Sequence, residues 1–206
     1  MAIDPKKALD AYQAKRGVFR IVDVPRMSYL MVDGAGDPNA SPMYAQAVGA
    51  LFPVAYGIKF AARARLGIDT VVMPLEGLWH ADDMTAFTTR RDASQWQWTL
   101  MVMMPDHVDG EMVEAAREAA ARKAEPSPLL GALRFASLDE GLSVQTLHVG
   151  PFDDEGPVLE ELHHRFLPEN GLAFSGRHHE IYLSDLRRVA PARLRTILRQ
   201  PVVRVG

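Results

Sequence analysis

Short stretches in which apolar and polar residues alternate recur along the chain, as is typical of β-strands with one buried face. On this pattern, strands are predicted at residues 18–22, 28–32, 70–79, 95–104, 133–137, 142–149 and 178–184. The clearest is 95–104, which is rich in tryptophan and methionine. Prolines at positions 25 and 74 lack a backbone donor, so we expect the chain to bend there or to lie at a sheet edge.

Apolar residues spaced three or four apart predict helices between these strands. The longest begins at Ser41 and Pro42, which are favoured at the start of a helix, and it ends at Gly67. Pro53 is expected to kink or divide this helix. Further helices are predicted at residues 111–123, 157–166 and 191–198, with a short helix or arm within residues 5–16.

The order strand, glycine-containing loop, proline-started helix and strand occurs twice. Two prolines stand eleven residues apart in both halves, at positions 42 and 53 and at positions 157 and 168. Each half then reaches a strand with a glutamate and an aromatic residue: Glu76 with Trp79, and Glu180 with Tyr182. We therefore predict an α+β fold of duplicated β–α–β–β units, with two antiparallel sheets and the helices on one face. The other faces of the sheets would meet or form a cleft.

The predicted organisation is a lead-in segment at residues 1–17 followed by a single domain at 18–206. The two repeats cover about 18–104 and 127–206. The stretch at about 109–124 is acidic at its start and basic at its end, which favours a helix. This helix would join the two repeats.

Composition narrows the functional classes. The chain has 206 residues, of which 48% are hydrophobic and 24% are charged, and its net charge is −3. No basic field draws it to nucleic acid, and the absence of cysteine excludes disulfides, thiolate nucleophiles and cysteine zinc sites. Neither a signal peptide nor a membrane-spanning stretch is recognised, so we expect a cytoplasmic protein without a membrane partner. The oligomeric state stays open.

The strand at 178–184 carries candidate chemistry. Ile181 and Leu183 share one face, which we expect to pack on a helix, and the other face presents His178, Glu180, Tyr182 and Ser184. This polar face is either solvated or the wall of a binding site. In such a wall, Glu180 would pair with a cationic ligand, or act as a general base if burial raised its pKa.

Three tryptophans, Trp79, Trp96 and Trp98, are a second feature. They are either part of the core or flat surfaces on which an aromatic or cationic ligand stacks, and the sequence does not choose between the two. Metal binding is disfavoured, because the adjacent pairs His163-His164 and His178-His179 cannot face one ion together. The loop at 33–39 lacks the signature of a phosphate-binding or dinucleotide-binding loop, so no cofactor is expected.

Six strings in order carry a resemblance to a known family. They are FRIVDVP (19–25), YLMVDGAGDPN (29–39), PLEGLW (74–79), WQWT (96–99), HHEIYLSD (178–185) and TILRQP (196–201). Together they resemble the stand-alone branch of the GyrI-like small-molecule-binding family, which is related to the effector-binding domains of multidrug-sensing transcription regulators. The resemblance covers nearly the whole chain.

The resemblance implies two β–α–β–β units side by side with a ligand cleft between them, and Glu180 as the acidic group of that cleft. Trp79, Trp98 and Tyr182 would line it, and further ligand-binding candidates are Tyr29, Met31, His148 and His178. The expected partner is a small aromatic or cationic molecule. The chain carries no recognisable helix-turn-helix, so direct nucleic-acid binding is not expected.

Some stand-alone members of this family hydrolyse DNA-alkylating antibiotics that contain a cyclopropane. By this resemblance Glu180 is the candidate catalytic base, and Tyr182 is the candidate donor to the attacking water or to the carbonyl oxygen of the substrate. Two alternatives stay open. The protein could bind, sequester or sense such compounds without changing them, or it could be a protein-interaction module of the gyrase-inhibitor type.

Overall fold

The computed structural model describes residues 2–83, 92–185 and 188–205. Within them, nine strands form one antiparallel sheet: β1 (Arg20–Val24), β2 (Met27–Ala35), β3 (Glu76–His80), β4 (Gln97–Met104), β5 (Arg134–Leu138), β6 (Gly141–Val149), β7 (Leu172–Phe174), β8 (His178–Tyr182) and β9 (Arg195–Arg204). The helices are α1 (Pro5–Ala8), α2 (Pro42–Leu66), α3 (Gly110–Ala121), α4 (Gly156–Glu161) and α5 (Leu167–Glu169). A π-helical turn, Leu162–Phe166, joins α4 to α5.

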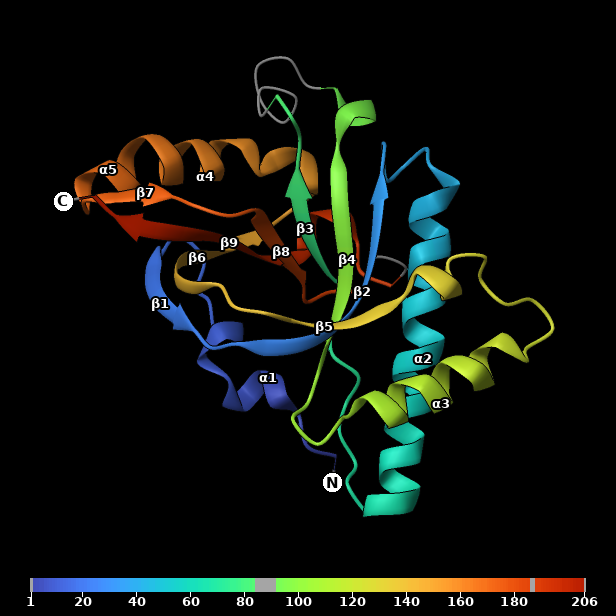
Figure 1. Cartoon of the computed structure of the whole chain (residues 1–206). Helices are drawn as coiled ribbons and strands as arrows, with labels where there is room; N and C mark the ends of the chain where they lie inside the picture. Colours follow the sequence, from blue (N-terminus) through green and yellow to red (C-terminus); the bar gives the residue numbers. More distant parts are fainter. Residues whose placement is uncertain (1, 84–91, 186–187, 206) are drawn as a thin grey trace.

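The sheet is symmetric about its central pair of strands. Its order is β1-β6-β9-β8-β3-β4-β2-β5, and β7 adds to β9. Outward from the β3–β8 pair, β4 corresponds to β9, β2 to β6, and β5 to β1. The fold is thus the predicted duplicated α+β arrangement, with its two sheets joined edge to edge by β3 and β8. In Figure 1 the strands β2, β3 and β4 stand upright, whereas β9 of the other half runs across the view.

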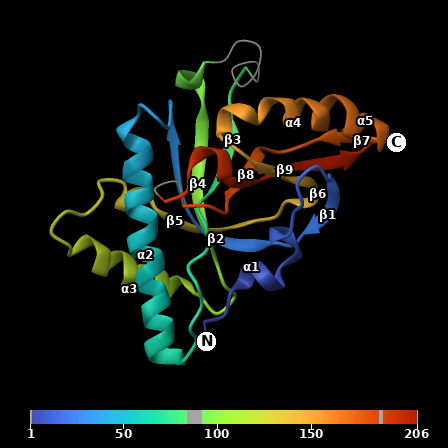
Figure 2. The ribbon, with the colours of Figure 1, turned by 180° about the vertical axis from the view of Figure 1, so that it is seen from behind.

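The principal helix of each half, α2 in the first and the α4–α5 segment in the second, lies on the same face of the sheet. The ring of Tyr44, in the first turn of α2, meets the ring of Trp98 of β4 edge-on at 5.5 Å. In the second half, Leu162 and Leu167 pack against Val144 of β6. Figures 1 and 2 show α2 on one half and α4 with α5 on the other, and α1 apart from both. The segment that follows α1 covers the opposite face of the sheet, where Tyr12 is buried.

Local sequence accounts for the ends of α2. The Ser41 side chain accepts a hydrogen bond from the Met43 backbone N–H, Pro42 occupies the first turn, and Gly67 ends the helix at φ 70°. The helix runs through Pro53 without the predicted division. By length and composition α2 could cross a membrane, but here its alanine-rich side packs on the sheet as part of the core.

Two predicted elements are wrong. Residues 191–198 do not form a helix: Pro191–Arg193 make one 3₁₀ turn, and β9 follows. β9 lies inside the sheet with both faces buried, so its apolar residues form a run that periodicity cannot distinguish from a buried helix. Residues 70–73 make a single bridge, from Thr70 to Ile3, and the strand begins only at Glu76, after Pro74.

The strands β5 and β6 are consecutive in sequence but do not pair with each other. β5 pairs with β2 and β6 pairs with β1, so the short connection between β5 and β6 crosses from one half to the other. The connection between β1 and β2 crosses in the same way. These two crossings, at residues 24–27 and 138–141, link the two halves of the sheet.

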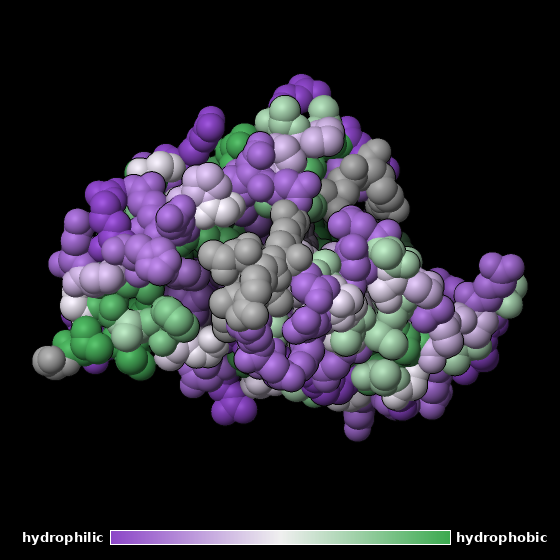
Figure 3. All heavy atoms as spheres, turned by 90° about the horizontal axis from the view of Figure 1, so that it is seen from above, coloured by the Kyte–Doolittle hydropathy of each residue, from purple (hydrophilic) through white to green (hydrophobic). Residues whose placement is uncertain are grey.

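The molecular surface seen from above is mainly hydrophilic, with apolar side chains gathered beside the C-terminal end (Figure 3). Exposed apolar residues of the β7–β9 pair include Phe174 and Val203. On α2, Tyr56 and Phe60 are exposed as well.

Candidate functional site

The candidate site is built at the junction of the two halves. In the antiparallel pair of β3 and β8, Gly77 lies directly opposite Glu180, so the Glu180 side chain leaves the sheet on the face that Trp79 also occupies. A Cβ atom on Gly77 would come within 2.9 Å of Trp79 Nε1 and 3.2 Å of the Tyr182 hydroxyl oxygen. Glycine therefore leaves the space in which these side chains meet.

A chain of hydrogen bonds ends at the Glu180 carboxylate. Trp79 Nε1 donates to the Tyr182 hydroxyl oxygen over 3.1 Å, and the Tyr182 hydroxyl donates to Glu180 Oε2 over 2.7 Å. The indole can only donate, so it directs the phenol proton towards the carboxylate. The side chain of Glu180 is 14% exposed, and Tyr182 and Trp79 are buried.

Aromatic rings surround this chain of hydrogen bonds. Phe152 meets Tyr182 edge-on at 5.5 Å between ring centroids, and Trp96 meets Trp79 edge-on at 5.7 Å. Phe152 precedes α4, and Tyr44, which belongs to the first turn of α2, also interacts with Tyr182. The site thus lies between the N-terminal ends of the two principal helices.

Burial sets the electrostatics of Glu180. Its removal from water raises the pKa of the carboxyl to about 7, although the hydrogen bond from Tyr182 and the charge of His179 act in the opposite direction. His178 is a basic group beside it, with Nε2 3.7 Å from Glu180 Oε1. Burial lowers the pKa of His178 to about 3, so this imidazole is neutral. Among the described residues, no lysine or arginine forms an ion pair with Glu180.

A second acid, Glu155, lies near the same phenol. It is buried, it directly precedes α4, and its charge contributes to the raised pKa of Tyr182 after burial and Glu180. Sequence reasoning missed Glu155, Tyr44 and Phe152 because they belong to loops and helix ends. The only local signal was their proximity to the predicted helix starts at Pro42 and Pro157.

The opposite face of the sheet carries a second glutamate, Glu76. In the pairing of β3 with β8, Glu76 lies opposite Ile181, and Gly77 lies opposite Glu180. The two glutamates are thus one position out of register with each other. The Glu76 side chain therefore leaves the sheet on the face opposite to that of Glu180. Glu76 accepts a hydrogen bond from the Tyr12 hydroxyl at 2.5 Å, and its other oxygen is 2.9 Å from His179 Nε2.

Glu76 belongs to a buried cluster in which charges are matched. His179 Nδ1 lies 2.9 Å from Glu140, and Arg199 donates to Glu140 over 2.6 Å. Burial alone would raise the pKa of Glu140, but His179 and Arg199 lower it to about 2. Burial opposes the charge on His179, and the two carboxylates nevertheless raise its pKa. Two carboxyl groups thus meet an imidazole and a guanidinium, which is the arrangement of a structural network.

The N-terminal segment seals this cluster. Arg199 donates to the backbone carbonyl of Ala11, and the Gln145 side chain donates to the carbonyl of Gln13 over 2.9 Å. The helix-free face, where the duplicated units would meet or form a cleft, is therefore covered by the chain itself. Ile181, which we expected to pack on a helix, faces this side, whereas Glu180 lies on the helix-bearing side.

The structure brings together most of the predicted site residues: Glu180, Tyr182, Trp79 and His178 are neighbours, and Trp98 lies on the same face, opposite Trp79 in β4. Trp98 lies over Gly34, where a Cβ atom would be 2.1 Å from the indole ring.

The other three predicted residues lie further away. His148 is on the Glu180 face, but β9 separates its strand from β8, and its Nε2 is 3.0 Å from the Pro151 carbonyl oxygen. Tyr29 and Met31 are on the opposite face, where Tyr29 lies near the Glu76 cluster. The structure does not bring these two residues together with Glu180, because the register of β2 turns them away.

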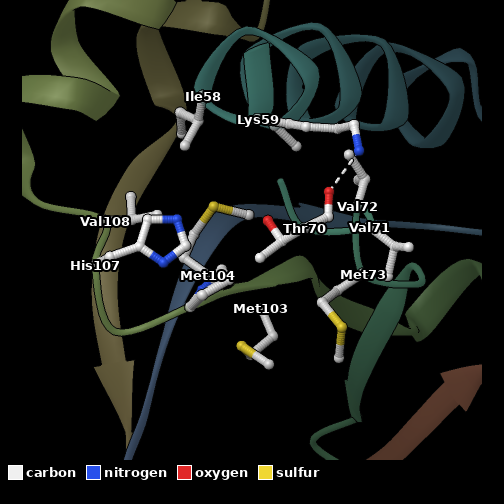
Figure 4. A pocket seen from close by; sticks show the side chains of 12 residues that line it. Ile58, Lys59, Thr70, Val71, Val72, Met73, Met103, Met104, His107 and Val108 are labelled. Carbon is white, nitrogen blue, oxygen red and sulfur yellow. Dashed lines mark hydrogen bonds between the residues drawn. The ribbon is translucent and has the colours of Figure 1, made fainter. Parts of the chain in front are cut away.

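A separate hollow lies beside the C-terminal half of α2 (Figure 4). Its lining includes Met73, Met104 and His107, and the Lys59 ammonium donates across it to the Thr70 carbonyl oxygen over 2.5 Å. It has room for about one water molecule, so it does not suit an organic ligand. Within the described parts of the chain, no three His, Asp or Glu side chains are grouped to hold a metal ion.

Comparison with known proteins gives the class and then the family. Residues 18–203 match the GyrI-like small molecule binding domain. Because this match spans most of the chain, the protein belongs to the GyrI-like family of small-molecule-binding domains, as the sequence motifs predicted. Residues 1–17, which include the segment over Glu76, lie outside the matched region. No curated protein matches the chain.

Solved structures agree with this assignment. An uncharacterized conserved protein from Listeria innocua is 40% identical, with a TM-score of 0.87 over 98% of this chain and 100% of that one. A hydrolase from Listeria innocua is 36% identical, with a TM-score of 0.84 over the same shares. The C-terminal domain of EcmrR is 14% identical, with a TM-score of 0.58 over 91% of this chain and 98% of that domain, and it shares the fold.

Proposed function

We propose that the Glu180 site binds planar aromatic cations and hydrolyses reactive, strained-ring compounds of the cyclopropanoid type. One observation carries this proposal: a carboxylate that is only 14% exposed, without an ion-pair partner among the described lysines and arginines, is hydrogen-bonded to Tyr182, whose ring packs against Phe152. The family is a small-molecule-binding one, and a 36% identical relative is a hydrolase.

Binding of a cation follows from desolvation. A carboxylate removed from water is costly unless an opposite charge lies next to it, and the raised pKa of Glu180 reflects that cost. A planar cation would supply the missing charge and would also be attracted to the faces of Trp79 and the neighbouring rings. The charge of Glu155 beside Tyr182 adds to this preference.

Hydrolysis needs a base that is partly ionised near neutral pH, and a pKa of about 7 meets this requirement. In the proposed reaction, Glu180 takes a proton from a water molecule whose oxygen forms a bond to a cyclopropane carbon. The ring C–C bond breaks, and its electron pair moves to a conjugated carbonyl oxygen of the substrate. The proton then passes to that oxygen, so the product differs from the substrate by one added water.

Tyr182 is positioned to assist this step. Its hydroxyl donates to Glu180, and a small rotation would let it donate instead to the water or to the carbonyl oxygen on which charge develops. Strain in the three-membered ring supplies part of the driving force, so modest assistance would suffice.

The test is incubation with a cyclopropane-fused cyclohexadienone, followed by mass spectrometry. We expect the wild-type protein to yield the product with one added water, and Glu180→Gln to bind without turnover. The exposed Glu160→Gln variant is the matched control and should behave as wild type. Binding without turnover by the wild type would contradict hydrolysis and favour sequestration or sensing; no binding at all would contradict the assigned site.

A further inference from the structure

Three buried ring nitrogens near the Glu180 strand make no well-formed hydrogen bond in the described part of the chain, although the Gln200 side chain lies close enough to His178 to act on its pKa. They are Nδ1 and Nε2 of His178 and Nε2 of His163. Burial is the main cause of the lowered pKa of both histidines, and the charge of His163 lowers the pKa of His178 further. Buried polar atoms are nearly always paired in folded proteins, so this cluster needs an explanation.

His163 is presented by an irregular element. It belongs to the π-helical turn Leu162–Phe166, and its ring lies 5.5 Å from the ring of Phe174. π-helical turns are rare, and those that interrupt α-helices are frequently found at functional sites. Here the turn places an imidazole over the sheet near His178. The adjacent His164 is exposed and does not share this position.

We infer that the ligand of the Glu180 site carries N–H donors on its positive charge, and that His178, with His163 beside it, accepts hydrogen bonds from them. This inference rests on the proposed cation binding and specifies the kind of cation. It assigns to the two imidazoles a role in specificity.

The chemistry of the acceptors supports this choice. A carboxylate oxygen only accepts hydrogen bonds, and a neutral imidazole always has one accepting nitrogen, whichever tautomer is present. Glu180 Oε1 and His178 Nε2 are 3.7 Å apart, so one charged nitrogen of a ligand can reach both. A ligand group that lies between them must donate to the carboxylate, and a protonated amine, amidine or guanidine does so.

A quaternary ammonium carries the same positive charge, but it cannot donate hydrogen bonds to these acceptors. It has no N–H, so it would leave the carboxylate oxygen and the imidazole unsatisfied after water is excluded. Leaving buried acceptors unpaired costs about tenfold or more in affinity. In a site that bound cations through ring faces and charge alone, affinity would instead rise with each methyl group added to the ligand, because each one brings more apolar contact.

The test uses naphthylmethylammonium and its mono-, di- and trimethylated forms at about pH 8, where Glu180 is mostly ionised and the amines remain charged. Binding to the wild-type protein is followed by quenching of tryptophan fluorescence. We expect the affinity to fall along the series, with the trimethylated cation at least about tenfold weaker than the primary one. Equal or tighter binding of the trimethylated form overturns the inference.

Three variants locate the effect. His178→Phe keeps a flat ring but removes both nitrogens, and it should abolish the preference for the primary amine. His163→Phe should weaken that preference, and His164→Phe, on the exposed side of the same turn, should leave it unchanged. The wild-type series decides the question if a variant does not fold.

The two proposals fail in different ways. If the trimethylated cation binds as well as the primary amine and Glu180→Gln abolishes both, the cation site stands and the role of the histidines is refuted. If no member of the series binds in a manner that depends on Glu180, the proposed cation site is refuted together with this inference.

Discussion

Gly77 of β3 lies directly opposite Glu180 of β8, and the space above its α-carbon is occupied by the groups that hydrogen-bond around that carboxylate. Trp79 and Tyr182 come from the two halves of the duplicated fold, and they meet over this glycine. The glycine is therefore part of the site although it has no functional group.

Replacement of this glycine should damage binding more than folding. In Gly77→Ala, the new methyl group would lie 2.9 Å from Trp79 Nε1 and 3.2 Å from the Tyr182 hydroxyl oxygen, so both side chains must move. We expect a loss of about 1–3 kcal/mol of stability, as in other overpacked sites, and a clear loss of cation affinity. Gly131→Ala, where a Cβ atom would meet nothing within 4 Å, is the control for thermal denaturation and ligand titration. Unchanged affinity in Gly77→Ala would contradict the site.

Cation affinity should rise with pH. The raised pKa of about 7 means that Glu180 is largely protonated at pH 5 and largely ionised at pH 8, and only the ionised form pairs with a cation. The gain over this interval is up to about a hundredfold. Calorimetric titration at several pH values with a permanently charged aromatic ligand measures it.

The outcome of that pH experiment also depends on whether the other groups that face Glu180 change their protonation. His178 and Tyr182 lie beside it, Tyr44 and Glu155 approach from the helices, and His179 acts from behind the strand. His178 and the tyrosines keep one protonation state between pH 5 and 8, because their pKa values are shifted away from this range. Glu180→Gln should therefore remove most of the pH dependence, and a slope that persists in this variant would assign it elsewhere.

Glu180 should destabilise the folded protein at neutral and alkaline pH. Its folded pKa of about 7 exceeds the ordinary value of 4.5, so the folded state binds the proton more tightly than the unfolded state does. Stability therefore falls as pH rises from about 4.5 to 7, by up to about 3 kcal/mol for this group. Glu180→Gln should raise the melting temperature at pH 8 and change it little at pH 4.5. An equal effect at both pH values would argue against a raised pKa.

The two tyrosines that donate to Glu76 and to Glu180 should differ in their roles. Tyr12→Phe leaves one oxygen of buried Glu76 without its partner, which should cost about 1–3 kcal/mol of unfolding free energy in urea and leave ligand affinity unchanged. Tyr182→Phe should reduce hydrolysis and ligand binding more than stability, because it acts on the other face. Loss of binding in Tyr12→Phe would show that the two faces are not independent.

Local sequence predicted what depends on near neighbours in the chain. Ser41, Pro42 and Gly67 mark the ends of α2, because capping needs only the residues of one turn. Alternation along residues 178–182 placed Glu180 and Tyr182 on one face, and the structure joins them by a hydrogen bond. The repeated order of elements and the family motifs predicted the duplicated α+β fold.

What the chain alone did not reveal depends on contacts between distant segments. No local period encodes the register that sets Gly77 opposite Glu180, turns Tyr29 and Met31 to the far face, or buries β9 on both sides. The same register gives the two glutamates of the central strand pair different surroundings: Glu76 meets Tyr12 and His179, while Glu180 meets Tyr182 and the neutral imidazole of His178. A carboxylate's chemistry follows from burial and neighbouring charge, and only the assembled sheet supplies both.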